Sequence, residues 1–196
     1  MNNIAPLLIV AVPALLTLIW FITNFNRFVR LKQHIRESWS GIDVELKRRY
    51  DLIPNLVETV KGYAAHERAV LEDVVKLRNR AAQSDGPASD QAIDESALAI
   101  GMKRLFVVVE KYPQLKSDAN YRALQAELAN TEDRLAASRR FFNGNVRELN
   151  QMCESFPTNL LARLFGFERA TYFELAADAE RVVPRLDLSA PGSAGG

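Results

Sequence analysis

An uncharged apolar run near the N-terminus constrains this chain more than any other feature. Residues 4–22 read IAPLLIVAVPALLTLIWFI, without one charged side chain. As an α-helix the run would span about 28 Å, close to the hydrocarbon thickness of a bilayer. Trp20 and Phe21 fall near its end, where membrane helices carry interfacial aromatic residues. The sequence therefore predicts a transmembrane anchor over residues 1–24.

A cleaved signal peptide is the alternative, and the flanks of the run argue against it. No Lys or Arg precedes the run, and TNFNRF follows it in place of a small-residue cleavage site. The juxtamembrane basic residues that follow are Arg27, Arg30, Lys32 and Arg36. By the positive-inside rule they predict a single-pass protein, with its N-terminus outside and its C-terminal part in the cytoplasm. They either set this topology alone or also bind anionic lipids.

A seven-residue apolar repeat, typical of packed helices, begins after the basic residues. Steps of four and three from Leu46 to Ala81 meet mostly uncharged positions. Pro54 interrupts this stripe, and a proline there removes a backbone hydrogen bond. We expect either a kink at Pro54 or a new helix capped by Asp51.

Two further stripes indicate two more helices. Residues 83–91 read QSDGPASDQ and predict a loop, and a second stripe covers residues 98–112 until a proline stops it. The third stripe repeats every seven residues, at Tyr121, Leu128, Leu135, Phe142, Leu149 and Phe156. Ser117 or Asp118 can cap this helix, and Pro157 ends it.

These patterns predict an all-α protein. We expect the N-terminal transmembrane helix to be followed by an elongated antiparallel bundle of three to four long helices over residues 25–177. Residues 159–175 are short, apolar and aromatic, and can form a fourth helix that caps the bundle. Residues 178–196 end in SAPGSAGG and are expected to be a flexible tail.

Composition and motifs give little support to a catalytic or metal-binding role. The chain has 25 Lys and Arg against 24 Asp and Glu, so it lacks the basic excess of a nucleic-acid binder. Its single cysteine, Cys153, and its two histidines, His34 and His66, do not form a zinc or di-iron pattern. No G-x-S-x-G nucleophile motif is present. We therefore expect a protein that is not an enzyme, with no cofactor and no nucleic-acid partner.

Polar residues inside the apolar stripes are the unusual feature. Glu67 occupies a core register position, Asn145 lies in the third stripe, and Glu132 and Arg139 flank that stripe. Buried charge is costly unless it is paired, so we expect these four residues to form a buried polar network, with Arg139 as the partner of Glu67. The network either fixes the helix register or forms a ligand or partner site.

Three sequence blocks carry a resemblance to a known family. They are LKRRYDLIPNLVETVKGYAAHE at residues 46–67, YRALQAELANTEDRLAASRRFFNGNVRELN at residues 121–150 and FPTNLLARLFGF at residues 156–167. In composition and order they resemble the LemA family. The motif positions are Trp39, Asp51, Ile53, Pro54, Asn55, Asn143, Asn150 and Pro157.

The resemblance implies a membrane anchor with an elongated antiparallel helical bundle. It implies no established enzymatic activity. Members of the family include magnetosome membrane proteins, and others are encoded near membrane proteases or secreted repair-type domains. The resemblance therefore favours envelope organisation or membrane remodelling at the cytoplasmic (inner) membrane of a bacterium.

Two classes of function remain open from the sequence. The first is a membrane-anchored scaffold whose partners are the lipid bilayer and further copies of itself. Its candidate assembly patch consists of Leu160, Leu164, Phe165, Phe167 and Phe173. Three alternatives are open for these side chains: they pack on their own bundle, on a neighbouring chain or on lipid headgroups. The second is an enzyme or sensor that uses the buried polar residues, and an adaptor for another membrane protein, such as a protease, is a weaker alternative.

Overall fold

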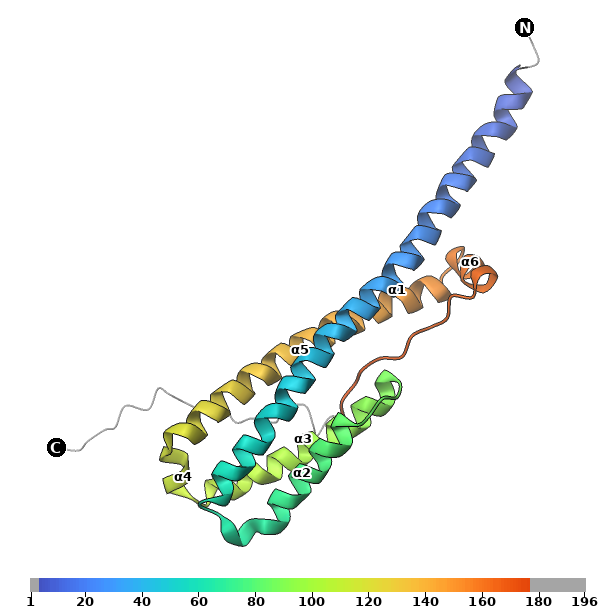
Figure 1. Cartoon of the computed structure of the whole chain (residues 1–196). Helices are drawn as coiled ribbons and strands as arrows, with labels where there is room; N and C mark the ends of the chain where they lie inside the picture. The colour runs from blue at the N-terminus through green and yellow to red at the C-terminus, as the bar shows by residue number, and fades with distance from the viewer. Residues whose placement is uncertain (1–3, 177–196) are drawn as a thin grey trace, which may run out of the picture. The chain divides into compact units, whose positions relative to one another are not determined.

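The computed structural model describes residues 4–176, with side chains from Ile9 onward. In this range it contains helices and no strand, which confirms the predicted all-α class. The elements are α1 (Ile4–Lys61), the 3-10 turn η1 (Ala65–Glu67), α2 (Arg68–Ala82), α3 (Ala88–Glu110), α4 (Pro113–Ser117), α5 (Ala119–Glu154) and α6 (Thr158–Phe165) (Figure 1). The tail expected over residues 178–196 lies outside the described residues.

The chain divides into two compact units, and both long helices contribute to each of them. Unit 1 combines Met1–Ser40 with Arg140–Tyr172, and unit 2 combines Gly41–Arg139 with Phe173–Gly196. In unit 1, α1 and α5 surround a core that α6 completes. In unit 2, the second part of α1 and the first part of α5 lie with α2, α3 and α4.

Helix α1 continues without a break through Pro54, so the new helix expected at Asp51 is wrong. A proline inside a helix costs about 3 kcal/mol, chiefly through one lost hydrogen bond and a steric clash. The neighbouring Ile53 and Leu56 are almost fully buried. Because burial of each large aliphatic side chain contributes about 1.5–3 kcal/mol, packing on both sides of Pro54 offsets its cost.

The first stripe breaks at residues 62–67 instead. The amides of Tyr63 and Ala64 both donate to the carbonyl oxygen of Val60, at 3.0 and 2.9 Å, and end α1. The stripe from Leu46 to Ala81 therefore covers two helices, α1 and α2. The seven-residue pattern persists because both helices bury their apolar side chains in the core of unit 2.

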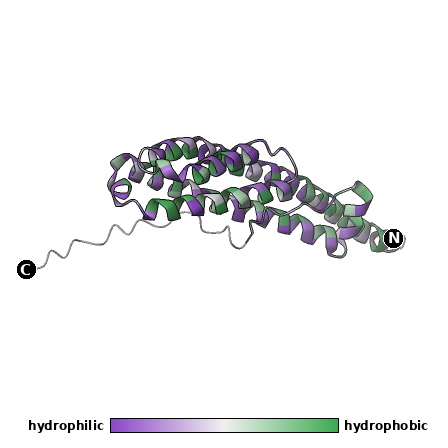
Figure 2. Cartoon of the chain, turned by 90° about the horizontal axis from the view of Figure 1, so that it is seen from below, coloured by the Kyte–Doolittle hydropathy of each residue, from purple (hydrophilic) through white to green (hydrophobic). Residues whose placement is uncertain are grey.

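Helices α2 and α3 pack as an antiparallel pair. Arg80 near the end of α2 pairs with Asp94 near the start of α3 at 2.7 Å, and Asp73 earlier in α2 pairs with Arg104 later in α3 at 3.3 Å. The chain between α2 and α3 falls within the loop expected over residues 83–91, although α3 begins earlier, at Ala88. Hydrophilic and hydrophobic residues alternate along the helices (Figure 2), as expected for amphipathic helices that share a core.

Helix α5 carries the strict third stripe into both units. Five of its six stripe positions are buried, namely Tyr121, Leu128, Leu135, Phe142 and Leu149, and the sixth, Phe156, lies beyond the helix end and is 80% exposed. Asp118 caps the helix, because its Oδ1 accepts the Tyr121 amide at 2.9 Å. That hydrogen bond, with a second one from the Tyr63 hydroxyl, lowers the pKa of Asp118.

Tyr121 makes the stability of unit 2 depend on pH in the alkaline range. Burial raises the pKa of its hydroxyl from 10 to about 12. Between pH 10 and pH 12 the hydroxyl of Tyr121 ionises in the unfolded chain but not in the folded one. The free energy of unfolding is therefore unaffected by this group below pH 10. It falls as the pH rises toward 12, by at most about 1.4 kcal/mol per pH unit. Tyr121→Phe should show a shallower decline in urea-unfolding free energy across this range. Equal slopes would mean that Tyr121 ionises alike in both states.

Candidate functional site

Arg49 is the centre of a buried charge cluster in unit 2. Its side chain, on α1, is the largest among those almost fully buried in the described chain, with 1% exposed. The guanidinium Nη2 forms an ion pair with Glu95 of α3, which is also 1% exposed. Nη1 pairs with Oε1 of Glu132 on α5 at 3.0 Å. One cation therefore connects carboxylates from two other helices.

Tyr50 completes this cluster. Its hydroxyl donates a hydrogen bond to Oε1 of Glu95, which gives that carboxylate a neutral partner as well as a cationic one. Burial raises the pKa of the Tyr50 hydroxyl, against the opposing effects of Arg49 and of a hydrogen bond with Gln91. The hydroxyl therefore stays protonated at neutral pH. From α2, Arg78 Nε donates to the Tyr50 carbonyl oxygen at 2.9 Å.

The chemistry of this cluster favours positioning over reaction. A guanidinium does not release its proton in the physiological range, so Arg49 cannot act as a general base. A buried charge is strongly destabilised when its partner is displaced, so the Arg49 pairs oppose sliding of α1, α3 and α5 past one another. The arrangement can fix helix register in the way that buried polar residues do in coiled coils.

The predicted buried polar network is not one site, and that prediction is wrong. Of its four residues, Glu132 pairs with Arg49 in unit 2. Asn145 lies in unit 1, where its Nδ2 donates to Ser38 Oγ at 3.3 Å. The turn after α1 carries Glu67 out of the core register. Its side chain is 26% exposed and pairs with Lys111 at 3.4 Å. Arg139 is half-buried on α5.

The sequence pattern contains a signal for Arg49 and Glu95, because both lie in the register of an apolar stripe. Arg49 lies three residues after Leu46 and four before Ile53, which places it within the first apolar stripe. Glu95 lies three residues before Leu98 and extends the second stripe backward. A basic and an acidic residue in the core registers of two different stripes are the expected signature of a buried ion pair.

The DLIPNL motif lies on α1 in unit 2 and is divided between core and surface. Ile53 is fully buried and Pro54 is half-buried, whereas Asp51 and Asn55 are exposed. The amide of Asn55 lies 3.5 Å from the Asp51 carbonyl oxygen one turn earlier. The motif therefore presents two polar side chains at the surface beside buried apolar ones.

The remaining motif positions are in unit 1. Asn150 is buried and holds the segment after α6, because its Nδ2 donates to the Ala170 carbonyl oxygen at 3.0 Å and its Oδ1 accepts the Ala170 amide at 2.8 Å. Trp39 contacts the Phe142 ring with centroids 5.3 Å apart. Asn143 is half-buried, and Pro157 precedes α6 as its N-cap.

The candidate assembly patch does not form a continuous surface. Phe173 is fully buried and belongs to unit 2, so for this residue the alternative of packing in cis holds. Phe167 is half-buried and stacks on Phe28 with ring centroids 4.6 Å apart. Leu160, Leu164 and Phe165 of α6 are 57%, 71% and 45% exposed. The patch thus reduces to three residues of α6.

The juxtamembrane basic residues lie on the exposed surface of α1. Arg27 pairs with Glu148 of α5 at 2.7 Å, and Lys32 Nζ lies 5.6 Å from the centroid of the Phe167 ring. Arg30 and Arg36 are also exposed. All four basic side chains are therefore exposed on unit 1.

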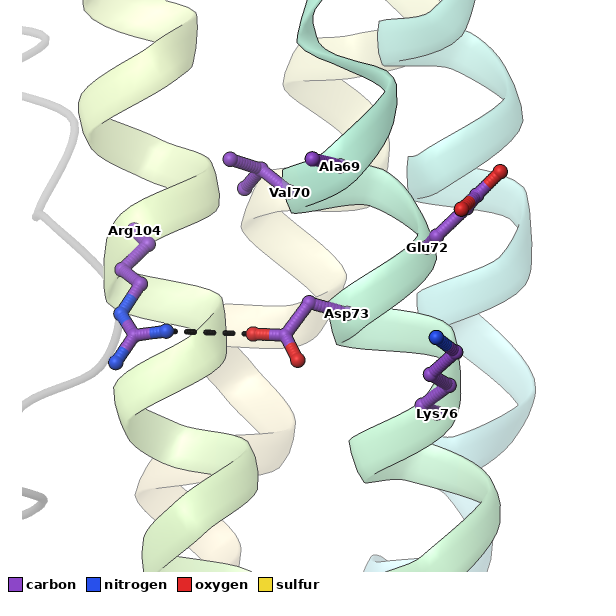
Figure 3. Close-up of a pocket in the computed structure, with 6 residues that line it drawn as sticks. All are labelled: Ala69, Val70, Glu72, Asp73, Lys76 and Arg104. Atoms are coloured by element: carbon purple, nitrogen blue, oxygen red, sulfur yellow. Dashed lines mark hydrogen bonds and ion pairs between the residues drawn. The ribbon is translucent and has the colours of Figure 1, made fainter.

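The described surface also has a shallow pocket between α2 and α3, of about 400 Å³. It is lined by Ala69, Val70, Glu72, Asp73, Lys76 and Arg104, and the Asp73–Arg104 ion pair crosses it (Figure 3). Among the described residues no group of three or more His, Cys, Asp or Glu side chains is close enough to hold a metal. The thiol of Cys153 is half-buried, and burial raises its pKa, which disfavours the reactive thiolate.

The fold and these sites define a class of helical proteins with one long apolar N-terminal helix and a buried charge cluster between packed helices. Residues 38–188 match the family model of the LemA family, and the chain belongs to that family.

Three relatives align with most of the chain. Magnetosome protein MamQ of Magnetospirillum gryphiswaldense is 26% identical over 206 residues, covering 88% of this chain and 75% of the relative. Magnetosome protein MamQ 2 of Paramagnetospirillum magneticum is 27% identical, covering 83% and 70%. Protein LemA of Metamycoplasma hominis is 24% identical, covering 83% and 74%. With the apolar part of α1, the family and the magnetosome proteins indicate a membrane-associated protein.

Proposed function

We propose that this chain is a non-catalytic scaffold, anchored by α1 in the cytoplasmic membrane of a bacterium, that self-assembles there. Its role is the organisation or remodelling of the membrane. Two relatives are named magnetosome proteins, which supports a role at a membrane-bound structure. The units after the apolar run lie in the cytoplasm, since the basic residues Arg27, Arg30, Lys32 and Arg36 follow the run.

The apolar part of α1 is the observation that carries this proposal. By length and composition, α1 is the one described helix able to cross a membrane, and its most apolar window has a mean hydropathy of 1.8 with none of it buried. Side chains such as Leu15 and Leu16 are 57% and 61% exposed. Exposed apolar surface on this scale is unfavourable in water and favourable in the hydrocarbon core.

Self-assembly follows from the anchor and from the surface. Confinement to a bilayer raises the effective concentration of the chains, so that weak lateral contacts suffice. The described surface offers apolar side chains for such contacts, including Ile93 and Val107 of α3, which are 64% and 59% exposed. Helix α5 has 36 residues, about 54 Å, along which contacts can repeat.

Two arginines in the apolar part of α1 should release the chain from membranes. The double variant carries Val12→Arg and Leu16→Arg. Insertion of each arginine near the centre of a membrane helix costs about 2.5–3.5 kcal/mol. Val44→Arg is the matched control, because Val44 lies on the same helix, is 59% exposed and is outside the run. We expect the double variant in the soluble fraction after carbonate extraction and the control in the membrane fraction. Retention of both variants in the membrane would contradict the proposed anchor.

A reporter fused to the C-terminus tests the topology of the same membrane-bound chain. We expect activity from a reporter that works only in the cytoplasm and none from one that works only outside. The reverse pattern would overturn the orientation and leave the anchor intact, so the two parts of the proposal fail separately.

A further inference from the structure

Helix α6 is amphipathic, and the rest of unit 1 covers only part of its apolar side. Leu161 and Ala162 are buried in the core of unit 1, beside Phe28. Next to them around the helix, Leu160 and Leu164, one turn apart, form an outer side and are 57% and 71% exposed. The polar residues Asn159 and Arg163 occupy the remaining side of the helix, and an amphipathic helix normally has its apolar side covered. The described residues leave Leu160 and Leu164 uncovered, so the outer side of α6 calls for a covering partner.

Ring contacts fix the position of α6 within unit 1. The Phe165 ring meets Phe21 with centroids 5.6 Å apart and Phe25 with centroids 5.0 Å apart, both edge to face. Phe21 is the last residue but one of the apolar run, which ends at Ile22. Helix α6 therefore lies beside the point where α1 leaves its apolar part (Figure 1).

The dimensions of a bilayer place this point at the headgroup layer. That layer is about 5–7 Å thick on each side, which a helix crosses in about four residues. With the apolar run in the hydrocarbon core, residues 22–26 of α1 cross the layer, and Phe25 lies within it. Leu164 is adjacent to Phe165, and a helix with its side chains is about 10 Å across, so the exposed side of α6 reaches the same depth.

We propose that α6 is an interfacial helix whose outer side is covered by the lipid bilayer. Lipid is the occupant favoured over a second protein, because the exposed side continues the apolar surface of the anchor at the same level. Arg163 on α6 and Arg30 on α1 are exposed and supply positive charge for phosphate groups. This inference rests on the anchor proposed above, and it adds a second membrane contact that restrains unit 1 against the bilayer.

Fluorescent labels on single cysteines test the depth of α6 in the intact chain. In a Cys153→Ala background, cysteine replaces Leu164, Phe141 or Leu15, and each labelled protein is reconstituted into vesicles of phosphatidylcholine and phosphatidylglycerol. Phe141 is the matched control, because it belongs to unit 1, is 63% exposed and lies more than three turns before the end of α5. Leu15 reports on the anchor. Quenching by nitroxide lipids and by aqueous iodide is then compared, after circular dichroism has verified equal helix content.

We expect the label at position 164 to be quenched by nitroxide lipids and to lose most of its iodide quenching, whereas the label at 141 shows the reverse. Quenching at 164 that matches 141 would overturn the inference. Protection of 164 from both quenchers would also overturn it, by indicating a second protein as the covering partner. If the label at position 15 escapes the lipid quencher, the anchor itself fails. If 15 is quenched and 164 is not, only the interfacial helix fails.

Discussion

Glu95→Ala is expected to lower the free energy of unfolding by about 3–5 kcal/mol, because it leaves the buried guanidinium of Arg49 with its positive charge poorly compensated. Glu95 is the ion-pair partner of Arg49 and the acceptor of the Tyr50 hydroxyl, and all three side chains are buried. The remaining carboxylate, Glu132 at 3.0 Å, is 20% exposed and so compensates the charge less well. Urea unfolding followed by circular dichroism in detergent measures the change.

Glu127→Ala is the matched control for this prediction. Glu127 pairs with Arg48, the chain neighbour of Arg49, at 3.0 Å, but both side chains of this pair are about half exposed. Exposed ion pairs contribute at most about 1 kcal/mol, so the control should change stability little. A cycle with Arg49→Ala, alone and combined with Glu95→Ala, should be strongly non-additive. Equal effects of Glu95→Ala and Glu127→Ala would refute the central role of the Arg49 cluster.

Phe28→Ala is expected to destabilise unit 1 by about 3–5 kcal/mol and to detach α6. Phe28 is fully buried, stacks on Phe167 and contacts the core that holds Leu161 and Ala162. Its removal leaves a cavity between α1 and the segment after α6. Limited proteolysis should then cleave near α6 faster than in the unaltered protein, and urea unfolding should report the loss of stability.

Phe141→Ala makes the same chemical change in the same unit at a side chain that is 63% exposed. Surface substitutions of this kind change stability within about 0.5 kcal/mol. We therefore expect no faster cleavage near α6 in this control. If Phe28→Ala and Phe141→Ala behave alike, α6 is not held by the Phe28 core.

The sequence predicts the long helices well and their connections less well. The seven-residue stripe of α5 marks buried positions from Tyr121 to Leu149, because one side of that helix faces a core along its length. The same kind of stripe crosses the turn at residues 62–67, since α1 and α2 fill one core with the same period. Pro54, the obvious breaker, lies inside α1, because buried neighbours outweigh one lost hydrogen bond.

The candidate site follows the same logic. Its type, a buried ion pair that joins helices, could be predicted from charged residues in apolar registers. Its member residues could not be identified without knowing where the helices end and turn. Glu67 occupies a core register only if the first helix continues past residue 62, and it does not. Arg49 and Glu95 meet because three helices pack together, and periodicity alone does not state which helix faces which.

The direct test of the proposed scaffold is the number of chains in each membrane particle. The full-length protein carries one fluorescent label at a described surface position such as Asn55 and is reconstituted into supported bilayers at rising surface density, where photobleaching steps are counted for each particle. We expect multi-step particles whose mean size grows with density, because membrane confinement makes weak lateral contacts effective. Particles that bleach in one step at every density would contradict it.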